Sequence, residues 1–279
     1  MTGKISFQGE LGAYSHQACL EACPQLEPVS AQTFEGAVEL ARSGATDFAM
    51  IPVENSTYGR VADVHQLLPE SGLQIVGEHF VRVHINLLGV PGATLAGVRR
   101  AISHTVLLGQ CRGYLKAHDI ERVTGTDTAG AARHVRDTGD ASLAALASPL
   151  AAELYGLDVL AEHIEDTGTN RTRFLIMAAE TARVTPRAGV MTAFIFRVRN
   201  LPAALYKAMG GFATNGVNMI KLESYMVDGS FTATQFFAEV EGHPEDPPVA
   251  RALEELAYFT SRLTILGVYP ASDLRQTEG

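Results

Sequence analysis

The chain alternates between apolar runs of strand length and helical patterns, and this alternation limits the folds it can adopt. Residues 47–53 form a continuous apolar run, which is typical of buried parallel strands. A helical pattern capped by Thr33 precedes it. Further strand–polar–helix units follow, with strands that end near Ile102, Val123 and Leu146. The alternation predicts an α/β fold with parallel sheets and helices packed on their faces.

Small polar side chains follow the ends of these strands. Because the carboxyl ends of parallel strands meet at one edge of a sheet, we expect these groups to line a cleft. None carries a charge, so the cleft would suit a small, oxygen-rich molecule. Each position alone is equally explained as a helix cap, but their repetition favours a shared site. They are Ser15, Asn55, Ser56, Ser103, Thr126, Thr128 and Thr172.

A polar segment, residues 165–173, separates the apolar residues 157–164 from the strand-like run 174–177. It holds an acid pair, an amide, three threonines, and the guanidinium groups of Arg171 and Arg173. Composition alone favours a solvated turn. Its place among the other strand ends instead predicts that it forms a wall of the same cleft.

The composition describes a packed chain with an acidic balance. The 279 residues are 46% hydrophobic and 19% charged, with a formal net charge of −9. That length predicts two or three domains. An acidic chain without basic runs is a poor nucleic-acid binder. No apolar region typical of a signal peptide precedes the first strand pattern, and no apolar run approaches the length of a membrane span. We therefore expect a cytoplasmic protein that binds neither nucleic acid nor membrane.

Cysteine and histidine give no signal for a metal site. Cys19, Cys23 and Cys111 are expected to be buried structural thiols. The nine histidines show no ligand spacing, so the sequence predicts no metal site.

The pattern of predicted strands and helices changes after residue 181. Residues 182–190 break the alternation and contain Pro186, so we predict a linker there. Residues 191–271 then read as strand, helix, two strands joined by a turn at Asp228-Gly229, helix and strand. This βαββαβ order is the ferredoxin-like arrangement. Phe236 and Phe237 are adjacent, which indicates either a sheet buried on both faces or an edge that contacts a second copy.

Five motifs in order resemble prephenate dehydratase across the whole chain. The resemblance implies a two-lobed, periplasmic-binding-protein-like catalytic domain over residues 1–181, with the active site in the cleft between its lobes. After the 182–190 linker, it implies an ACT regulatory domain over residues 191–271. The motifs are Gly9…Gly12-Ala13-Tyr14-Ser15-His16-Gln17-Ala18, Pro52-Val53-Glu54-Asn55-Ser56, Ser103-His104 with Gln110-Cys111, the Ala151-Ala152 helix ending Tyr155-Gly156-Leu157, and Asn170-Arg171-Thr172-Arg173-Phe174.

The resemblance also implies an activity and its residues. The reaction is the decarboxylative dehydration of prephenate to phenylpyruvate, CO₂ and water in L-phenylalanine biosynthesis, a lyase reaction without a cofactor. Thr172 would donate to the leaving hydroxyl. The planar fork of Arg173 would bind a carboxylate. By the resemblance, Asn55, Ser103 and Gln110 would be further catalytic residues. Of the strand-end groups, we expect Ser56, Ser15 and Thr128 to bind the substrate.

For the C-terminal domain, the resemblance implies an allosteric phenylalanine site between ACT domains that pair in a dimer or tetramer. Two departures leave inhibition by phenylalanine open. Ala203 stands where the family has glycine, and Tyr225-Met226 stands where it has Arg-Pro. The implied regulatory positions are Ala203, Ala204, Leu205, Asn218, Glu223 and Ser224.

Two other functions fit parts of the sequence. An arogenate dehydratase would perform the same reaction on an amino-group analogue of prephenate. A two-lobed small-molecule sensor without catalysis would share the fold. The Asn-Arg-Thr-Arg-Phe segment and the absence of a DNA-binding helix pattern favour the enzyme.

Overall fold

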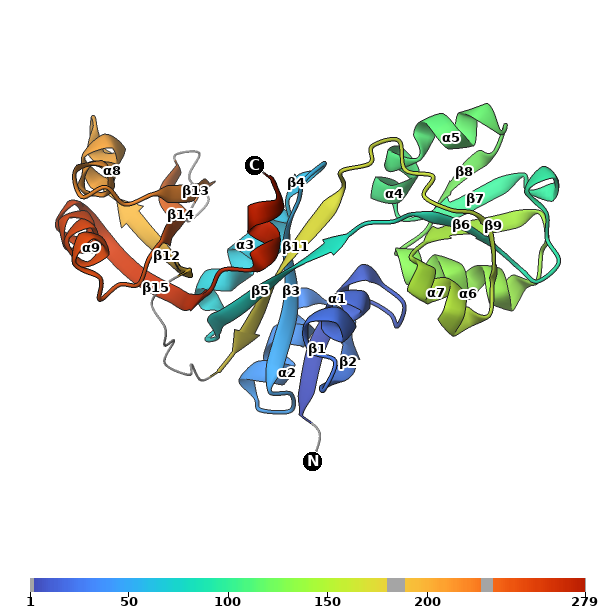
Figure 1. Ribbon diagram of the computed structural model, residues 1–279, viewed down its shortest axis with the longest axis horizontal. Coiled ribbons are helices and arrows are strands. Elements are labelled where there is room, and N and C mark those ends of the chain that lie inside the picture. The colour runs from blue at the N-terminus through green and yellow to red at the C-terminus, as the bar shows by residue number, and fades with distance from the viewer. Residues whose placement is uncertain (1–2, 180–188, 227–232, 279) are drawn as a thin grey trace. The chain divides into compact units, whose positions relative to one another are not determined.

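The computed structural model describes residues 3–179, 189–226 and 233–278. It contains two compact units (Figure 1). The first comprises Met1–His65 and His79–Leu175, and the second comprises Gln66–Glu78 and Ile176–Gly279. The predicted catalytic domain, residues 1–181, therefore differs from the first unit at Gln66–Glu78 and after Leu175. Most of the predicted 182–190 linker, and the Asp228-Gly229 turn, lie outside the described residues.

The first lobe of the first unit is a mixed sheet with helices α1 (Tyr14–Ala22) and α2 (Phe34–Arg42). Strand β1 pairs in parallel with β2 and β3, so the carboxyl ends of these strands meet at one edge. The neighbouring strands follow the order β5-β11-β3-β1-β2. They are β1 (Lys4–Gln8), β2 (Glu27–Ala31), β3 (Phe48–Asn55), β5 (Gln74–Arg82) and β11 (Arg171–Ala178). The short β4 (Gly59–Arg60) folds back on β3 and leads into α3 (Ala62–Leu67) and a 3₁₀ turn, Leu68–Glu70.

The second lobe is a five-stranded sheet in the order β10-β6-β9-β7-β8. Alternate residues of its central strands enter two cores. Leu146 packs with Leu107 and Leu115 on one face, whereas Ala145 packs with Ala132 on the other. The strands are β6 (Asn86–Gly89), β7 (Arg100–Ser103), β8 (Glu121–Thr124), β9 (Leu143–Ala147) and β10 (Asp158–Ala161). The helices are α4 (Thr105–Gln110), α5 (Arg112–Ala117), α6 (Thr128–Thr138) and α7 (Pro149–Tyr155), with a 3₁₀ turn at Leu95–Gly97. This confirms the predicted two-lobed α/β arrangement.

Two crossing segments join the lobes and run side by side. Residues 83–85 lead from β5 to β6, and residues 162–170 lead from β10 to β11. Val83 N donates to Asn170 O, and Ile164 N donates to Ile85 O, each at 2.9 Å. These bonds make the two crossings a single hinge.

A tight contact between α1 and α7 also holds the lobes. Ser148 Oγ donates to Gly12 O at 2.6 Å. Gly12 has φ +92°, and a Cβ added there would lie 3.1 Å from Ala151 Cα. Both the conformation and the close approach require glycine.

The second unit has the predicted βαββαβ order, with strands in the order β13-β14-β12-β15 and antiparallel neighbours. Phe236 is buried in the cluster beneath the two helices, and the adjacent Phe237 is also buried. The sheet is therefore buried on both faces, which is one of the two explanations expected for this pair. The elements are β12 (Val190–Val198), α8 (Ala204–Thr214), β13 (Met219–Met226), β14 (Ala233–Glu241), α9 (Pro247–Phe259), β15 (Thr260–Pro270) and a 3₁₀ helix, Asp273–Glu278.

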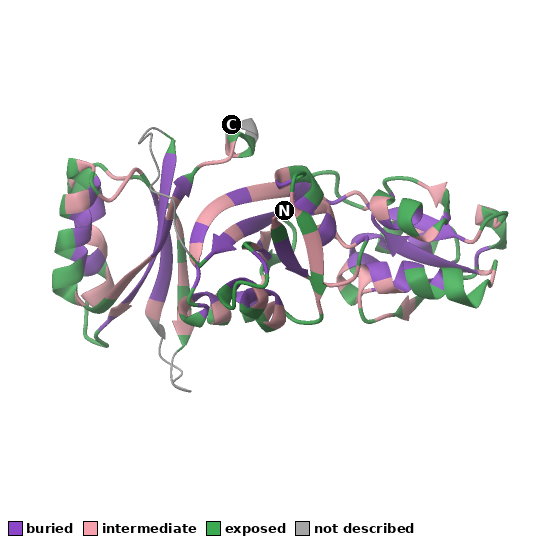
Figure 2. Ribbon diagram, turned by 90° about the horizontal axis from the view of Figure 1, so that it is seen from below, coloured by how far each residue is buried: buried purple, intermediate pink, exposed green. Residues whose placement is uncertain are grey.

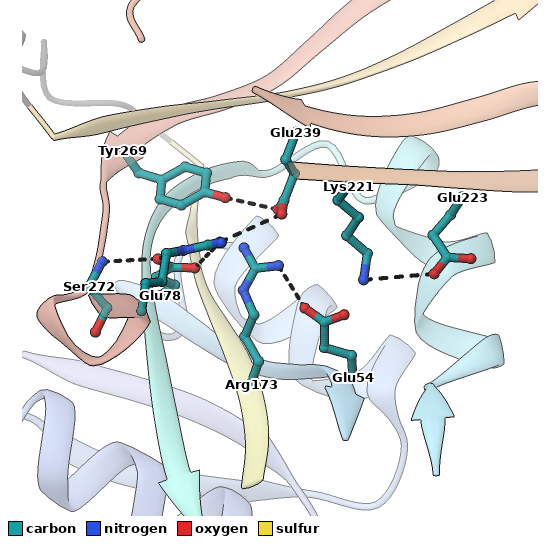
Figure 3. A network of polar contacts seen from close by, with 9 residues as sticks. Glu54, Glu78, Arg173, Lys221, Glu223, Glu239, Tyr269 and Ser272 are labelled. Carbon is teal, nitrogen blue, oxygen red and sulfur yellow. Dashed lines mark hydrogen bonds and ion pairs between the residues drawn. The ribbon is translucent and has the colours of Figure 1, made fainter. Parts of the chain in front are cut away.

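A buried polar network explains why Gln66–Glu78 belongs to this second unit. The Glu78 side chain is fully buried and accepts two bonds from Arg275, from Nε at 2.5 Å and from Nη2 at 2.6 Å. It also accepts from Ser272 N at 2.9 Å (Figure 3). Tyr269 Oη donates to Glu239 at 2.9 Å. Glu78 thus anchors residues that lie almost 200 positions later in the chain.

Burial follows the layers (Figure 2): buried residues gather on the sheets, and exposed residues lie on the outer faces of the helices. Cys19, Cys23 and Cys111 are buried and unpaired, which confirms the prediction for these thiols. Among the residues that the structure describes, no helix combines the length and apolar character needed to cross a membrane.

Candidate active site

A cavity of about 500 Å³ lies within the first unit, at the strand ends of both lobes. Its wall combines polar and apolar side chains. The polar residues include Ser15, Asn55, Tyr58, Arg60, His104, Gln110, Thr126, Thr128 and Thr172, and the apolar ones include Phe34, Pro52, Leu107 and Phe174. Most of the neutral strand-end groups selected from the sequence therefore do line one cavity.

Asn55 organises the polar wall. Its Oδ1 accepts from the backbone N–H groups of Thr57 and Tyr58, both at 3.0 Å. Backbone N–H groups only donate, so these bonds fix the orientation of the amide. Its Nδ2 therefore donates to Asn170 Oδ1 at 2.7 Å and to Thr172 Oγ1 at 3.1 Å.

This orientation of the Asn55 amide determines which polar atoms nearby have no hydrogen-bond partner. Thr172 Oγ1 is an acceptor toward Asn55, so its own hydrogen is directed elsewhere. Asn170 is 2% exposed, and its Nδ2 has no hydrogen-bond partner among the described residues. Buried Gln110 Oε1 is likewise unpartnered within the described part of the chain. Unpaired buried polar atoms are costly, so a bound molecule is their natural partner.

The start of α1 adds an anion-binding feature. Its N-cap, Ala13, makes no side-chain cap bond, so the first N–H groups of the helix keep their capacity to donate. Ser15, in the first turn, is buried and lines the cavity. A helix N-terminus favours negative charge. Arg60 also lines the cavity and supplies a cation there.

Arg173 does not fit the role expected from the sequence. Its side chain is 3% exposed and pairs with Glu54 Oε1 at 2.9 Å, as Figure 3 shows. Its guanidinium carbon lies 6.0 Å from the centre of the Phe80 ring. Because successive residues of β11 point to opposite faces, the cavity side chains Thr172 and Phe174 exclude Arg173 from their face. The expected carboxylate contact is corrected to a buried ion pair.

Ser56 and Ser103 also differ from expectation. Ser56 Oγ donates to Thr169 O at 3.0 Å and accepts from Arg171 N at 2.9 Å. These bonds fasten the end of β3 to the start of β11. Ser103 is fully buried, and its hydroxyl donates to Leu146 O at 2.7 Å. Both hydroxyls are thus engaged in holding strands, and neither lies among the side chains of the cavity wall.

Sequence reasoning missed three residues of the site. Asn170 heads the polar motif, but only the fold shows that Asn55 fixes its amide. His104 was part of a motif and lines the cavity, where its Nδ1 accepts from Val106 N at 3.3 Å. Arg60 lies on β4. This strand has only two residues, which is too short to be predicted from the sequence pattern.

The hinge beside this cavity carries its own polar cluster. Tyr14 Oη donates to His84 O at 2.7 Å. Burial raises the pKa of Tyr14 well above its usual value, with Cys111 and Glu165 adding to the effect, so the phenol stays protonated. Burial, with His163 nearby, lowers the pKa of His84. Glu165 Oε2 accepts from Ile85 N at 3.0 Å.

The comparisons with known proteins identify the family. The family model for prephenate dehydratase matches residues 5–182. The chain belongs to the prephenate dehydratase family. It is 37% identical to arogenate dehydratase/prephenate dehydratase 1, chloroplastic, of Arabidopsis thaliana, over 98% of this chain and 73% of the relative.

Two further relatives cover nearly the whole chain. The bifunctional N-acyl-homoserine lactone acylase/prephenate dehydratase of Komagataeibacter europaeus is 52% identical, over 98% of this chain and 97% of the relative. The crystal structure of the prephenate dehydratase of Arthrobacter aurescens in complex with L-Phe superposes with a TM-score of 0.88 at 28% identity, over 97% of this chain and 90% of that one. These matches confirm the family expected from the motifs.

Proposed function

We propose that this cavity catalyses the conversion of prephenate to phenylpyruvate, CO₂ and water, a lyase reaction of L-phenylalanine biosynthesis. The observation that carries the proposal is the hydrogen bond from Asn55 to Thr172, which leaves the hydrogen of the Thr172 hydroxyl free to be donated at the cavity wall. Membership of the prephenate dehydratase family supports it.

The chemistry needs positioning and one proton. The bond to the ring carboxylate breaks, its electron pair enters the ring, and the ring hydroxyl leaves from the opposite carbon. One proton converts that hydroxyl to water, and the new aromatic ring supplies the driving force. In our proposal the Thr172 hydroxyl donates to the leaving oxygen as its bond breaks. Loss of one such preorganised donor costs roughly 10²–10³-fold in turnover.

The substrate is a dianion, and its carboxylates need partners other than Arg173. We assign them to Arg60 and to the uncapped start of α1 with Ser15. Arg60→Gln should raise the KM for prephenate by roughly tenfold, the effect of about 1.4 kcal/mol, with a smaller change in kcat. Arg122→Gln is the control, since Arg122 is exposed and lies outside the cavity wall. An unchanged KM in Arg60→Gln would assign the carboxylates to the helix start alone.

One assay tests the proposed reaction. Purified protein is supplied with prephenate and, separately, with arogenate, and the aromatic product is identified. We expect phenylpyruvate from prephenate. Phenylalanine formed from arogenate at the higher kcat/KM would make the chain an arogenate dehydratase, an alternative supported by the Arabidopsis relative. Failure to form either product would leave a non-catalytic sensor of small molecules as the remaining function.

Hydrolysis of N-acyl-homoserine lactones is a second candidate activity, because the 52% identical relative carries that name. The apolar side chains of the cavity, such as Phe34 and Leu107, offer contacts for an acyl chain. His104 is the candidate base for activating water there. Release of homoserine lactone by the wild type, lost in His104→Asn, would support this activity. No release at any acyl length would contradict it.

For the second unit, we propose a regulatory role as an ACT-type domain that binds phenylalanine and pairs with a second copy in a dimer or tetramer. The βαββαβ order supports it, as does the relative described in complex with L-Phe. The proposed positions remain Ala203, Ala204, Leu205, Asn218, Glu223 and Ser224. Titration with phenylalanine should change activity and sedimentation together, and a response in neither would refute regulation.

A further inference from the structure

Two histidines and a buried glutamate meet on the hinge between the lobes. His84 lies on the first crossing, and His163 and Glu165 lie on the second. Each of the three side chains offers one possible ligand atom, a ring nitrogen or a carboxylate oxygen. These three atoms all lie within 4.8 Å of one another. The imidazole rings of the two histidines have centroids 4.1 Å apart. The spacing of 79 positions along the chain hides this cluster from any sequence pattern.

The cluster has free capacity for a ligand. His84 Nδ1 is buried, makes no hydrogen bond to any described residue, and faces Glu165 Oε1 at 3.5 Å. The Glu165 side chain is only 4% exposed, and its other oxygen is held by Ile85 N. One carboxylate oxygen and one ring nitrogen therefore point at each other without a close bond between them.

The third side chain is held in an unusual backbone conformation. His163 has φ +52°, in the left-handed region that is uncommon for residues other than glycine, although asparagine, aspartate and histidine adopt it more often than the rest. Its backbone N–H donates to Asn86 Oδ1 at 3.1 Å, which fixes that turn. The His163 side chain is exposed, so it can rotate toward the other two.

We propose that His84, His163 and Glu165 form a hinge site for a divalent transition-metal ion, with Zn²⁺ as the best match. Imidazole nitrogen and carboxylate oxygen are ligands that suit zinc. Ligand atoms about 2.0–2.2 Å from a tetrahedral ion lie roughly 3.4 Å apart. The His84–Glu165 separation already meets that spacing, and rotation of His163 brings in the third ligand. Water would complete the coordination.

The consequence of binding is mechanical. The site joins both crossings between the lobes, so a bound ion would restrict their relative movement and the opening of the cavity. The dehydration itself needs no step at this ion. The site would therefore act on the hinge and leave the chemistry of Thr172 and Asn55 unchanged.

The test uses the untagged full chain, Zn²⁺ alone as the probe, and titration against a chelating indicator. His163→Asn removes the imidazole, and asparagine tolerates the positive φ, so the fold should persist, which circular dichroism can verify. We expect one Zn²⁺ per chain in the wild type and an affinity reduced at least tenfold in His163→Asn. Even the loss of an outer partner of a metal ligand costs roughly 10–100-fold. His118→Asn is the matched control, because His118 is exposed, stacks on Tyr114 and is not one of the three cluster residues.

A second readout places the ion on the hinge. Zn²⁺ should slow amide hydrogen exchange in residues 83–85 and 162–170 of the wild type, and not in His163→Asn. Visible absorption of bound Co²⁺ should show nitrogen and oxygen ligation without sulfur. Equal Zn²⁺ affinity in the wild type and His163→Asn would overturn the proposal, and so would the absence of binding.

Discussion

At the scale of single residues, Thr172 and Arg173 show how one position separates two roles. Both belong to β11, and both were selected as site residues from the same motif. Thr172 lines the cavity and accepts a bond from Asn55, whereas Arg173 is buried on the other face with Glu54. The hydroxyl that remains free to donate is therefore the group on which turnover should depend.

Thr172→Val should keep the fold and lower turnover by roughly 10²–10³-fold, because valine has nearly the same shape but no proton to donate. Phenylpyruvate formation measures the effect, and a thermal melt verifies the fold. Thr172→Ser is the control, since it keeps the hydroxyl and should retain most of the activity. Turnover within a few-fold of wild type in the valine variant would remove Thr172 from the mechanism.

At the scale of elements, the helices α1 and α8 begin in ways that stability measurements can test. At α1, Gly12 N donates to His16 Nδ1 at 3.0 Å, so the ring must be unprotonated at that nitrogen. At α8, Ala203 is the N-cap and has φ +61°. The stability of the α1 start should depend on pH through His16, whereas the α8 start carries backbone strain at Ala203.

Burial lowers the pKa of His16 in the folded chain. In the unfolded chain, His16 has the ordinary histidine pKa of about 6.5. The unfolded state therefore binds the proton first. The contribution of His16 to stability is fully present above pH 6.5 and is lost as pH falls from there to the lowered folded value. Denaturant unfolding between pH 8 and 5 should show this decline in the wild type and in the exposed-site control His134→Asn. The decline should be smaller in His16→Asn, and equal slopes in all three would contradict it.

Ala203→Gly should stabilise the second unit by about 1 kcal/mol, because glycine adopts the left-handed conformation without the clash of a Cβ. The contrast is Ala213→Gly, at an exposed position in the last turn of α8, which should destabilise by up to about 1 kcal/mol. Denaturant midpoints at constant slope measure both changes. If both substitutions destabilise, Ala203 is not strained in the protein.

At the scale of the whole molecule, each compact unit is built from two segments that are not contiguous in the sequence. Gln66–Glu78 lies between segments of the first unit, yet it clusters with Ile176–Gly279. Pairing of Ile75 with Gly267 and the bonds from Arg275 to Glu78 account for this. The stability of the second unit should therefore depend on a residue from the middle of the catalytic sequence.

Arg275→Met should lower the stability of the second unit by about 3 kcal/mol, because it leaves the fully buried Glu78 carboxylate without its guanidinium. Hydrogen exchange in β12 and β15 should report the loss locally. Arg262→Met, at an exposed position on β15, is the control and should change stability by less than about 0.5 kcal/mol. Equal protection in the two variants would show that Glu78 is stable without Arg275.

The sequence by itself determined the α/β alternation, the βαββαβ order and several polar residues of the cavity wall, among them Ser15, Asn55, Thr128 and Thr172. These follow from local periodicity and from the meeting of parallel strand ends. Only the tertiary structure decided that β11 begins at Arg171 and turns Arg173 away from the cavity. It also brought His84 to Glu165 and Glu78 to Arg275. Which face a side chain takes, and what covers it, depends on packing between distant segments, and no local pattern carries that information.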